Sequence, residues 1–133
     1  MTVEEKVYSI LSGNAGVTAL CPATRIKPSG DVRGLDFPFI VYFPVSVHTT
    51  QIHNTGLANL KHWLFQISCF GETYSSTKAL AVAVVAALGS YRTGGINSHY
   101  SGERTIPYEP FQPFDTKIRV EQIALEFDIW DSL

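Results

Sequence analysis

Residues 60–91 read LKHWLFQISCFGETYSSTKALAVAVVAALGSY and join a strand pattern to a helix pattern through a short polar turn. Alternate side chains of the first segment are apolar and are expected to share one face of a strand: Trp63, Phe65, Ile67 and Cys69. Either Thr73 or Ser75 is placed to cap a helix that runs to about Leu88. This helix carries no polar side chain from residue 79 to residue 88.

The apolar helix raises the question of what covers it. A helix on the outside of a single sheet normally carries a polar stripe, and none follows Lys78. Val82 and Val85 are expected to point in different directions, so one sheet and one further helix would not cover both. We therefore expect a homo-oligomer, with Val82 and Val85 in the interface between copies.

The remaining patterns predict the fold class. Thr2 is expected to cap a first helix, whose apolar face is spaced at helical intervals: Val3, Val7, Ile10 and Leu11. Residues 39–47 alternate as a strand, in which Pro44 marks an edge or a bulge. A short strand is expected over residues 96–100 and a long last strand over Lys117–Trp130. Two main helices on a mostly antiparallel sheet of about four to five strands predict a single α+β domain, residues 1–133.

Two stretches are candidates for contact with other proteins. Residues 48–59, HTTQIHNTGLAN, are polar and uncharged, and we expect a loop longer than an ordinary hairpin turn and therefore functional. Its interface candidates are His48, Thr49, Thr50, Gln51, Ile52, His53 and Asn54. Glu126 and Asp128 are two residues apart on the last strand and so share one face. A solvated or intersubunit strand face is favoured there over a paired-acid catalytic site.

Composition and motifs argue against several functional classes. The net charge of −2 does not favour binding to nucleic acid, and no apolar run approaches the ~20 residues of a membrane span. Thr2–Lys6 is polar and acidic, so no signal peptide is expected. His48 and His53 have no third ligand nearby, and no nucleophile elbow, GxGxxG or P-loop motif is present. We expect neither an enzyme nor a cofactor or metal. Cys69 is expected to pack as a free thiol, with a disulfide to Cys21 left open.

Three pieces of the chain carry a family resemblance by their order and spacing. They are GNAGVTALCPATRIKP at residues 13–28, FPFIVYFPVS at residues 37–46, and LKHWLFQISCFGETYSSTKALAVAVVAAL at residues 60–88. A long final strand with acidic residues follows. Together they resemble the tail completion proteins of long-tailed bacteriophages, also called tail terminators or head-to-tail joining proteins. Residues 90–114 match only loosely.

The resemblance implies a structural virion protein of a phage, a prophage or a phage-derived gene transfer agent. Members of that family form hexameric rings at the head-proximal end of the tail tube, end its polymerisation and provide the surface to which the head docks. The implied partners are further copies of the chain, the tail tube protein and a head–tail connector or neck protein, assembled in the host bacterial cytoplasm. Two alternatives remain open: a neck or head-completion protein below the portal, and a small α+β ligand-binding protein unrelated to phage.

Overall fold

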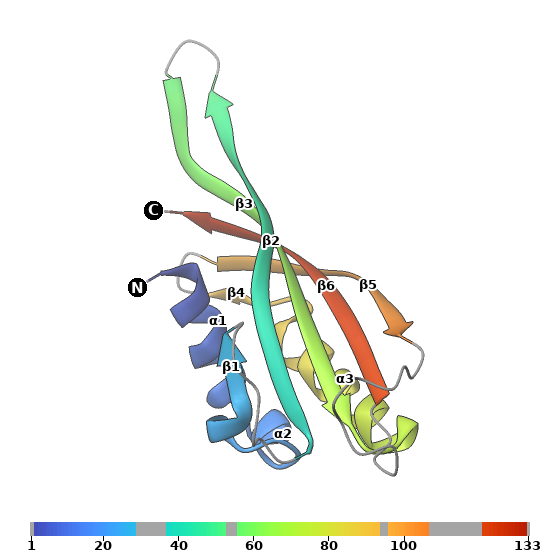
Figure 1. The fold of residues 1–133 in the computed structure, drawn as a ribbon. Helices are drawn as coiled ribbons and strands as arrows, with labels where there is room; N and C mark the ends of the chain where they lie inside the picture. The colour runs from blue at the N-terminus through green and yellow to red at the C-terminus, as the bar shows by residue number, and fades with distance from the viewer. Residues whose placement is uncertain (1, 29–36, 53–55, 94–95, 107–120, 133) are drawn as a thin grey trace.

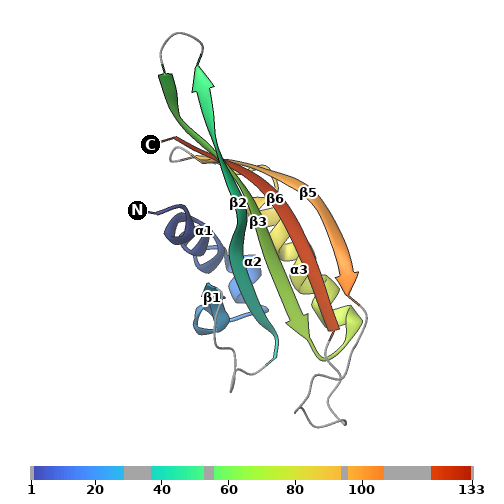
Figure 2. The ribbon, with the colours of Figure 1, turned by 45° about the horizontal axis from the view of Figure 1, so that its top comes forward.

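A six-stranded sheet with helices packed against it makes up the fold. The computed structural model describes residues 2–28, 37–52, 56–93, 96–106 and 121–132. The strand order is β1-β2-β3-β6-β5-β4, and α1, α2 and α3 lie against one face of the sheet (Figure 1). The second view shows the same two layers (Figure 2). The predicted α+β class is therefore confirmed.

The bounds of the helices and strands are as follows. The helices are α1 (Val3–Ser12), α2 (Ala15–Thr18), a 3-10 turn (Ala23–Arg25) and α3 (Tyr74–Leu88). The strands are β1 (Ile26–Pro28), β2 (Phe39–Ile52), β3 (Gly56–Gly71), β4 (Arg92–Thr93), β5 (Ile96–Ile106) and β6 (Glu121–Ser132). β1 pairs parallel with β2, whereas every other pairing is antiparallel. The sheet is thus mostly antiparallel, with four long strands and a short one at each edge.

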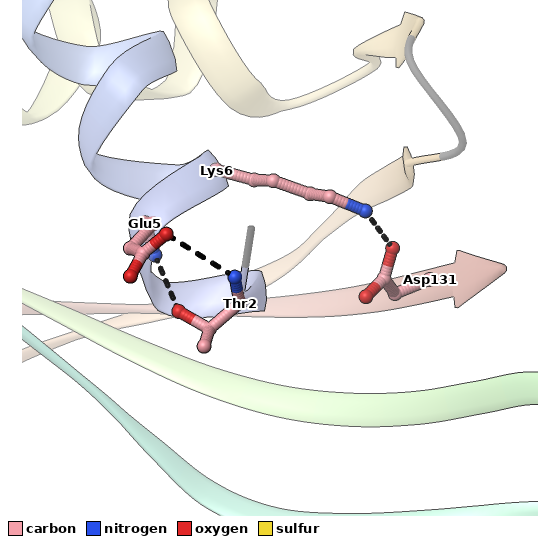
Figure 3. A network of polar contacts seen from close by, with 4 residues as sticks. All are labelled: Thr2, Glu5, Lys6 and Asp131. Carbon is pink, nitrogen blue, oxygen red and sulfur yellow. Dashed lines mark hydrogen bonds and ion pairs between the residues drawn. The ribbon is translucent and has the colours of Figure 1, made fainter. Parts of the chain in front are cut away.

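The first helix begins where its cap was predicted. The Thr2 hydroxyl accepts a hydrogen bond from the Glu5 backbone N–H at 3.2 Å, and the Glu5 carboxylate accepts one from the Thr2 N–H at 3.4 Å. This reciprocal capping box satisfies two backbone donors that a helix start would otherwise leave open. One turn on, Lys6 Nζ lies 2.6 Å from Asp131 Oδ1 near the end of β6 (Figure 3). The ion pair ties α1 to the sheet.

The core lies between α3 and the helix-covered face of the sheet. The buried side of α3 recurs at helical spacing: Thr77, Leu80, Ala81, Val84, Ala87 and Leu88. It packs against alternate residues of the two central strands: Phe65, Ile67, Cys69, Ile123, Leu125, Phe127 and Ile129. These strand faces are the predicted ones. Cys21 and Cys69 are both buried free thiols, and burial raises the pKa of Cys21 to about 11 and raises that of Cys69 as well.

The prediction of a loop over residues 48–59 is wrong for most of that range. His48–Ile52 continues β2 and Gly56–Asn59 begins β3, with Gln51 opposite Leu57. Residues 53–55 lie outside the described part of the chain. The strands were missed because the sequence of this hairpin shows no alternation of apolar and polar residues, which is the signal of a strand with one face on the core.

Pro44 stands at a break in pairing, as its position predicted. The register between β2 and β3 shifts between Pro44 and Ser46, which is where a residue without a backbone N–H is tolerated. The extra residue inverts the alternation beyond it. Val47 therefore lies opposite Trp63, on the face that also carries the buried Phe65.

Candidate assembly surfaces

The side of α3 that faces away from the core is apolar and exposed. Ala79, Val82 and Ala86 are exposed, and Val82 keeps 57% of its surface open. Val84, two residues further on, is completely buried. The chain therefore covers one side of this helix and presents methyl groups on the other, where a polar stripe is usual.

A shallow groove runs between this exposed side and β5. Val82, Val85 and Tyr100 line it, and its volume is about 210 Å³. The expectation that these two valines point in different directions is wrong, because both line this groove. Residues three apart are neighbours on a helix surface. The Lys78 ammonium donates to the Glu103 carboxylate beside the groove, and this hydrogen bond raises the pKa of Lys78. The groove is thus an apolar strip with a neutralised charge pair at its rim.

Asp128 belongs to a polar and aromatic cluster on the opposite face of the sheet. It alternates along β6 with the buried Phe127 and Ile129, so it faces away from the helices. The His62 Nε2 lies 2.8 Å from Asp128 Oδ1, and the His62 ring stacks on Trp130 with centroids 4.5 Å apart. His99 meets the same indole edge-on at 5.5 Å. This cluster gives the face hydrogen-bonding groups held in place by aromatic contacts.

Glu126 shares that face with Asp128, as the spacing predicted. Its Oε1 lies 3.7 Å from Arg104 Nη2, a distance too long for a hydrogen bond, and ion pairs exposed to this degree contribute at most about 1 kcal/mol to stability. Each carboxylate therefore contacts its own basic side chain. The Arg104–Glu126 contact is loose, whereas the His62–Asp128 contact is within hydrogen-bonding distance.

The third surface is the end of the β2–β3 hairpin. Pairing of β3 with β6 ends at Leu60, whereas β2 and β3 continue past it and, among the described residues, pair only with each other. We call residues 50–52 and 56–59 the hairpin arm; it projects beyond the rest of the sheet (Figures 1 and 2). Of the interface candidates, His48–Ile52 lies in β2, whereas His53 and Asn54 fall outside the described residues.

The arm also offers backbone edges for contact, which the sequence patterns did not reveal. In a two-stranded ribbon, each strand has one edge whose backbone N–H and C=O groups have no partner within the ribbon. Such edges can pair with an extended segment of another protein. The candidate contact is therefore backbone pairing along the arm as well as side-chain contact at a loop.

Within the described part of the chain, no group of three or more His, Cys, Asp or Glu side chains is placed to hold a metal ion. None of the helices described is long and apolar enough to cross a membrane.

Comparison with known proteins gives a family and a fold. A family model described as tail completion protein gp17 matches residues 5–95. No curated protein sequence matches the chain significantly. Among 23 matching chains of solved structures, one comes from a structure described as "Virion of native gene transfer agent (GTA) particle", with a TM-score of 0.63 and 21% identity. The match covers 96% of this chain and 92% of that one.

Proposed function

The chain belongs to the tail completion protein gp17 family and is thus a structural protein of a phage-type tail; from this premise we propose that it caps the head-proximal end of the tail tube. There it ends polymerisation of the tube and joins the tail to the head. The particle is encoded by a bacteriophage, a prophage or a gene transfer agent, and the protein assembles in the cytoplasm of the bacterial host.

The family match over residues 5–95 carries this proposal. That range runs from α1 to the end of β4, so it includes the hairpin arm and the whole of α3. A capping protein has to contact several proteins at once, and the surfaces described above supply separate places for such contacts.

We assign the surfaces as follows. The hairpin arm, with the adjoining His48 and Thr49 and with His53 and Asn54, contacts the tail tube protein or the head–tail connector. Val82 and Val85 contact a neighbouring copy of the chain in a ring. The family resemblance implies that this ring has six copies. Glu126 and Asp128 belong to a polar strand face that another subunit covers. No catalytic step is part of this role.

The test is disruption of the gene in its phage or prophage, followed by electron microscopy of the lysate. We expect filled heads separate from tails, and tail tubes that exceed their normal length, because nothing ends their growth. Complete particles in normal numbers would contradict the proposal. Tails of normal length beside heads that have lost their DNA would instead assign the protein to the neck, below the portal.

A further inference from the structure

We propose that β2 accepts an added strand from the tail tube protein along its outer edge, at Ser46–Thr49. The segment that binds is extended and uncharged, and backbone hydrogen bonds join it to the sheet as a further strand. The inference rests on the proposed capping role and names the site on this chain, which lies next to the hairpin arm but outside it.

The outer edge of β2 has no strand beside it over most of its length. β1 pairs with β2 only along Ile40–Tyr42, whereas β2 continues to Ile52. No other described strand lies on that side of β2. From Phe43 onward, the backbone N–H and C=O groups that point outward therefore have no strand partner among the described residues. Such groups are a template for the addition of a strand from another protein.

Two irregularities limit the part of this edge that is regular enough to pair. The register with β3 shifts between Pro44 and Ser46 and again between Thr49 and Gln51, and Pro44 has no backbone N–H to donate. Between the shifts, Ser46–Thr49 pairs without interruption with residues 61–64 of β3. A regular edge this short suits one short segment and resists longer, uncontrolled pairing.

The rest of the sheet holds this part of β2 in place. Residues 61–64 of β3 lie opposite residues 128–131 of β6, which in turn lie opposite residues 96–99 of β5. Ser46–Thr49 is thus the edge of four paired strands, whereas the hairpin arm has two. An edge that is already fixed loses less conformational entropy when it binds a strand.

The other edge of the sheet shows how this chain blocks a strand. The backbone N–H groups of Ser98 and Tyr100 in β5 donate to the carbonyl oxygens of Tyr91 and Gly89, at 2.8 and 3.0 Å. Further along, β5 carries adjacent acidic and basic residues, a common protection of edge strands. β2 has no such charges, because residues 37–60 contain no Asp, Glu, Lys or Arg.

The side chains along this edge indicate what kind of segment fits. Val45 and Val47 are 51% and 46% exposed, and a side chain of an added strand would lie beside Val47 at the spacing of neighbouring strands. An uncharged segment with β-branched or other apolar residues suits these positions. Because the edge continues into the hairpin arm of a tail protein, a segment of the tube protein is the occupant rather than a second copy of the chain.

Amide hydrogen exchange followed by mass spectrometry tests this site. Tails and heads are purified from a lysate in which the gene is disrupted, and the full-length chain is added to each separately. In the free chain, the outward N–H groups of Ser46–Thr49 should exchange rapidly, since alternate residues of a strand face opposite edges. Binding to tails should slow their exchange at least tenfold. The Ser98 and Tyr100 amides, already bonded within the chain, are the control and should not change.

Adjacent proline substitutions supply matched variants. Of Ser46 and Val47, one directs its N–H outward, and the exchange rates of the free chain identify which. Proline at that position should keep the melting temperature within a few degrees but weaken binding to tails at least tenfold, because it removes the donor and its ring occupies the edge. Proline at the other position should lower the melting temperature, because it removes a hydrogen bond to β3. Tail binding of the stable variant equal to that of the unaltered chain would contradict the inference.

The other outcomes separate this inference from the capping role. Unchanged exchange at Ser46–Thr49 in the chain bound to tails would overturn the added strand and leave the capping role in place. Slower exchange with heads instead of tails, or in the concentrated chain alone, would overturn the choice of the tube protein and indicate the connector or a second copy. Failure of the capping role is read in the lysate itself, as complete particles without this protein.

Discussion

At the scale of single residues, α3 carries valine both on its buried side and on its exposed side. Val84 is completely buried against the sheet and Val82 is 57% exposed, although they are two positions apart on the same helix. Their comparison separates what the chain needs for folding from what it needs for assembly.

We predict that Val84→Asp destabilises the isolated chain by about 3–5 kcal/mol, because it buries a carboxylate without a partner. Val82→Asp is the matched control, with the same change in helix propensity, and should alter the free energy of unfolding by no more than about 0.5 kcal/mol. Denaturant titration at low protein concentration measures both. Equal effects of the two substitutions would show that the burial of α3 is not as described.

The ion pair between Lys6 and Asp131 is a second residue-scale test. The Asp131 side chain is only 6% exposed, so Lys6→Met should destabilise the fold by about 3 kcal/mol through the unpaired carboxylate left behind. Replacing both partners, as Lys6→Met with Asp131→Leu, should restore most of that loss because no buried charge remains. Thermal melting of the two variants gives the comparison, and a double variant no more stable than the single one would contradict the role assigned to the pair.

The buried thiols predict a loss of stability in alkali. In the unfolded chain Cys21 ionises near its ordinary pKa of 9.0, whereas burial raises the folded pKa to about 11. The unfolded state therefore releases protons first as the pH rises above about 9, and the free energy of unfolding falls between about pH 9 and 11. Cys21→Ala should show a shallower fall over the same range, after allowance for its lower starting stability. Equal slopes would show that the thiol ionises freely in the folded chain.

At the scale of elements, the hairpin arm can be removed without touching the core. Thr49 lies opposite Lys61, so residues 50–60 can be replaced by an Asn-Gly turn, which suits a two-residue hairpin loop. The replacement removes the arm and also Leu60, the end residue of the β3–β6 pairing, which lies opposite Ser132. We predict that this variant keeps the melting temperature of the full chain within a few degrees, because the arm strands pair only with each other in the part of the chain that the structure describes. It should fail to restore joined particles when it replaces the natural gene, whereas the full-length gene restores them.

Infectious particles in normal numbers from the shortened chain would contradict the role given to the arm. A collapse of stability would show instead that the arm contributes to the fold, which its pairing does not indicate.

The sequence predicted those elements whose pattern is fixed by the core. The caps at Thr2 and Thr73, the alternation of β3 and β6 and the bulge after Pro44 all follow from local chemistry, and the structure has them. The apolar faces of the two central strands followed from the same alternation, which indicates a sheet with one side against helices.

Elements without such a pattern were missed or cut short. β5 was expected to end at Tyr100 but reaches Ile106. The extension was missed because it follows a register shift between Tyr100 and Gly102 and most of its residues are exposed and polar: Ser101, Glu103, Arg104 and Thr105. The parallel pairing of β1 could not be read from three residues, since parallel and antiparallel edges share the same composition. The arm was missed for a related reason: its strands are held by backbone pairing with each other, which leaves no pattern in the sequence.

The candidate surfaces were only partly visible in the sequence. Val82 and Val85 stood out because a bare apolar helix is unusual. The partners His62 for Asp128 and Arg104 for Glu126 come from strands distant in the chain, and only the register of the sheet brings them together.

At the scale of the whole molecule, the chain divides its apolar side chains between its own core and surfaces that are open to other proteins. Its own fold covers one side of α3 and one face of the sheet. Exposed hydrophobic side chains remain on β2, at Val45 and Val47, and beside β5, at Val82 and Tyr100, and the arm projects beyond the rest of the sheet. This division suits a subunit that contacts both copies of itself and a different protein.

A cryo-EM reconstruction of the head–tail junction of the intact particle tests this claim most directly. The account predicts a ring of this chain on the head-proximal end of the tube, with Val82 of each copy buried against its neighbour and the arm in contact with the tube or the connector. A junction without this protein, or a ring in which Val82 faces solvent in every copy, would contradict it.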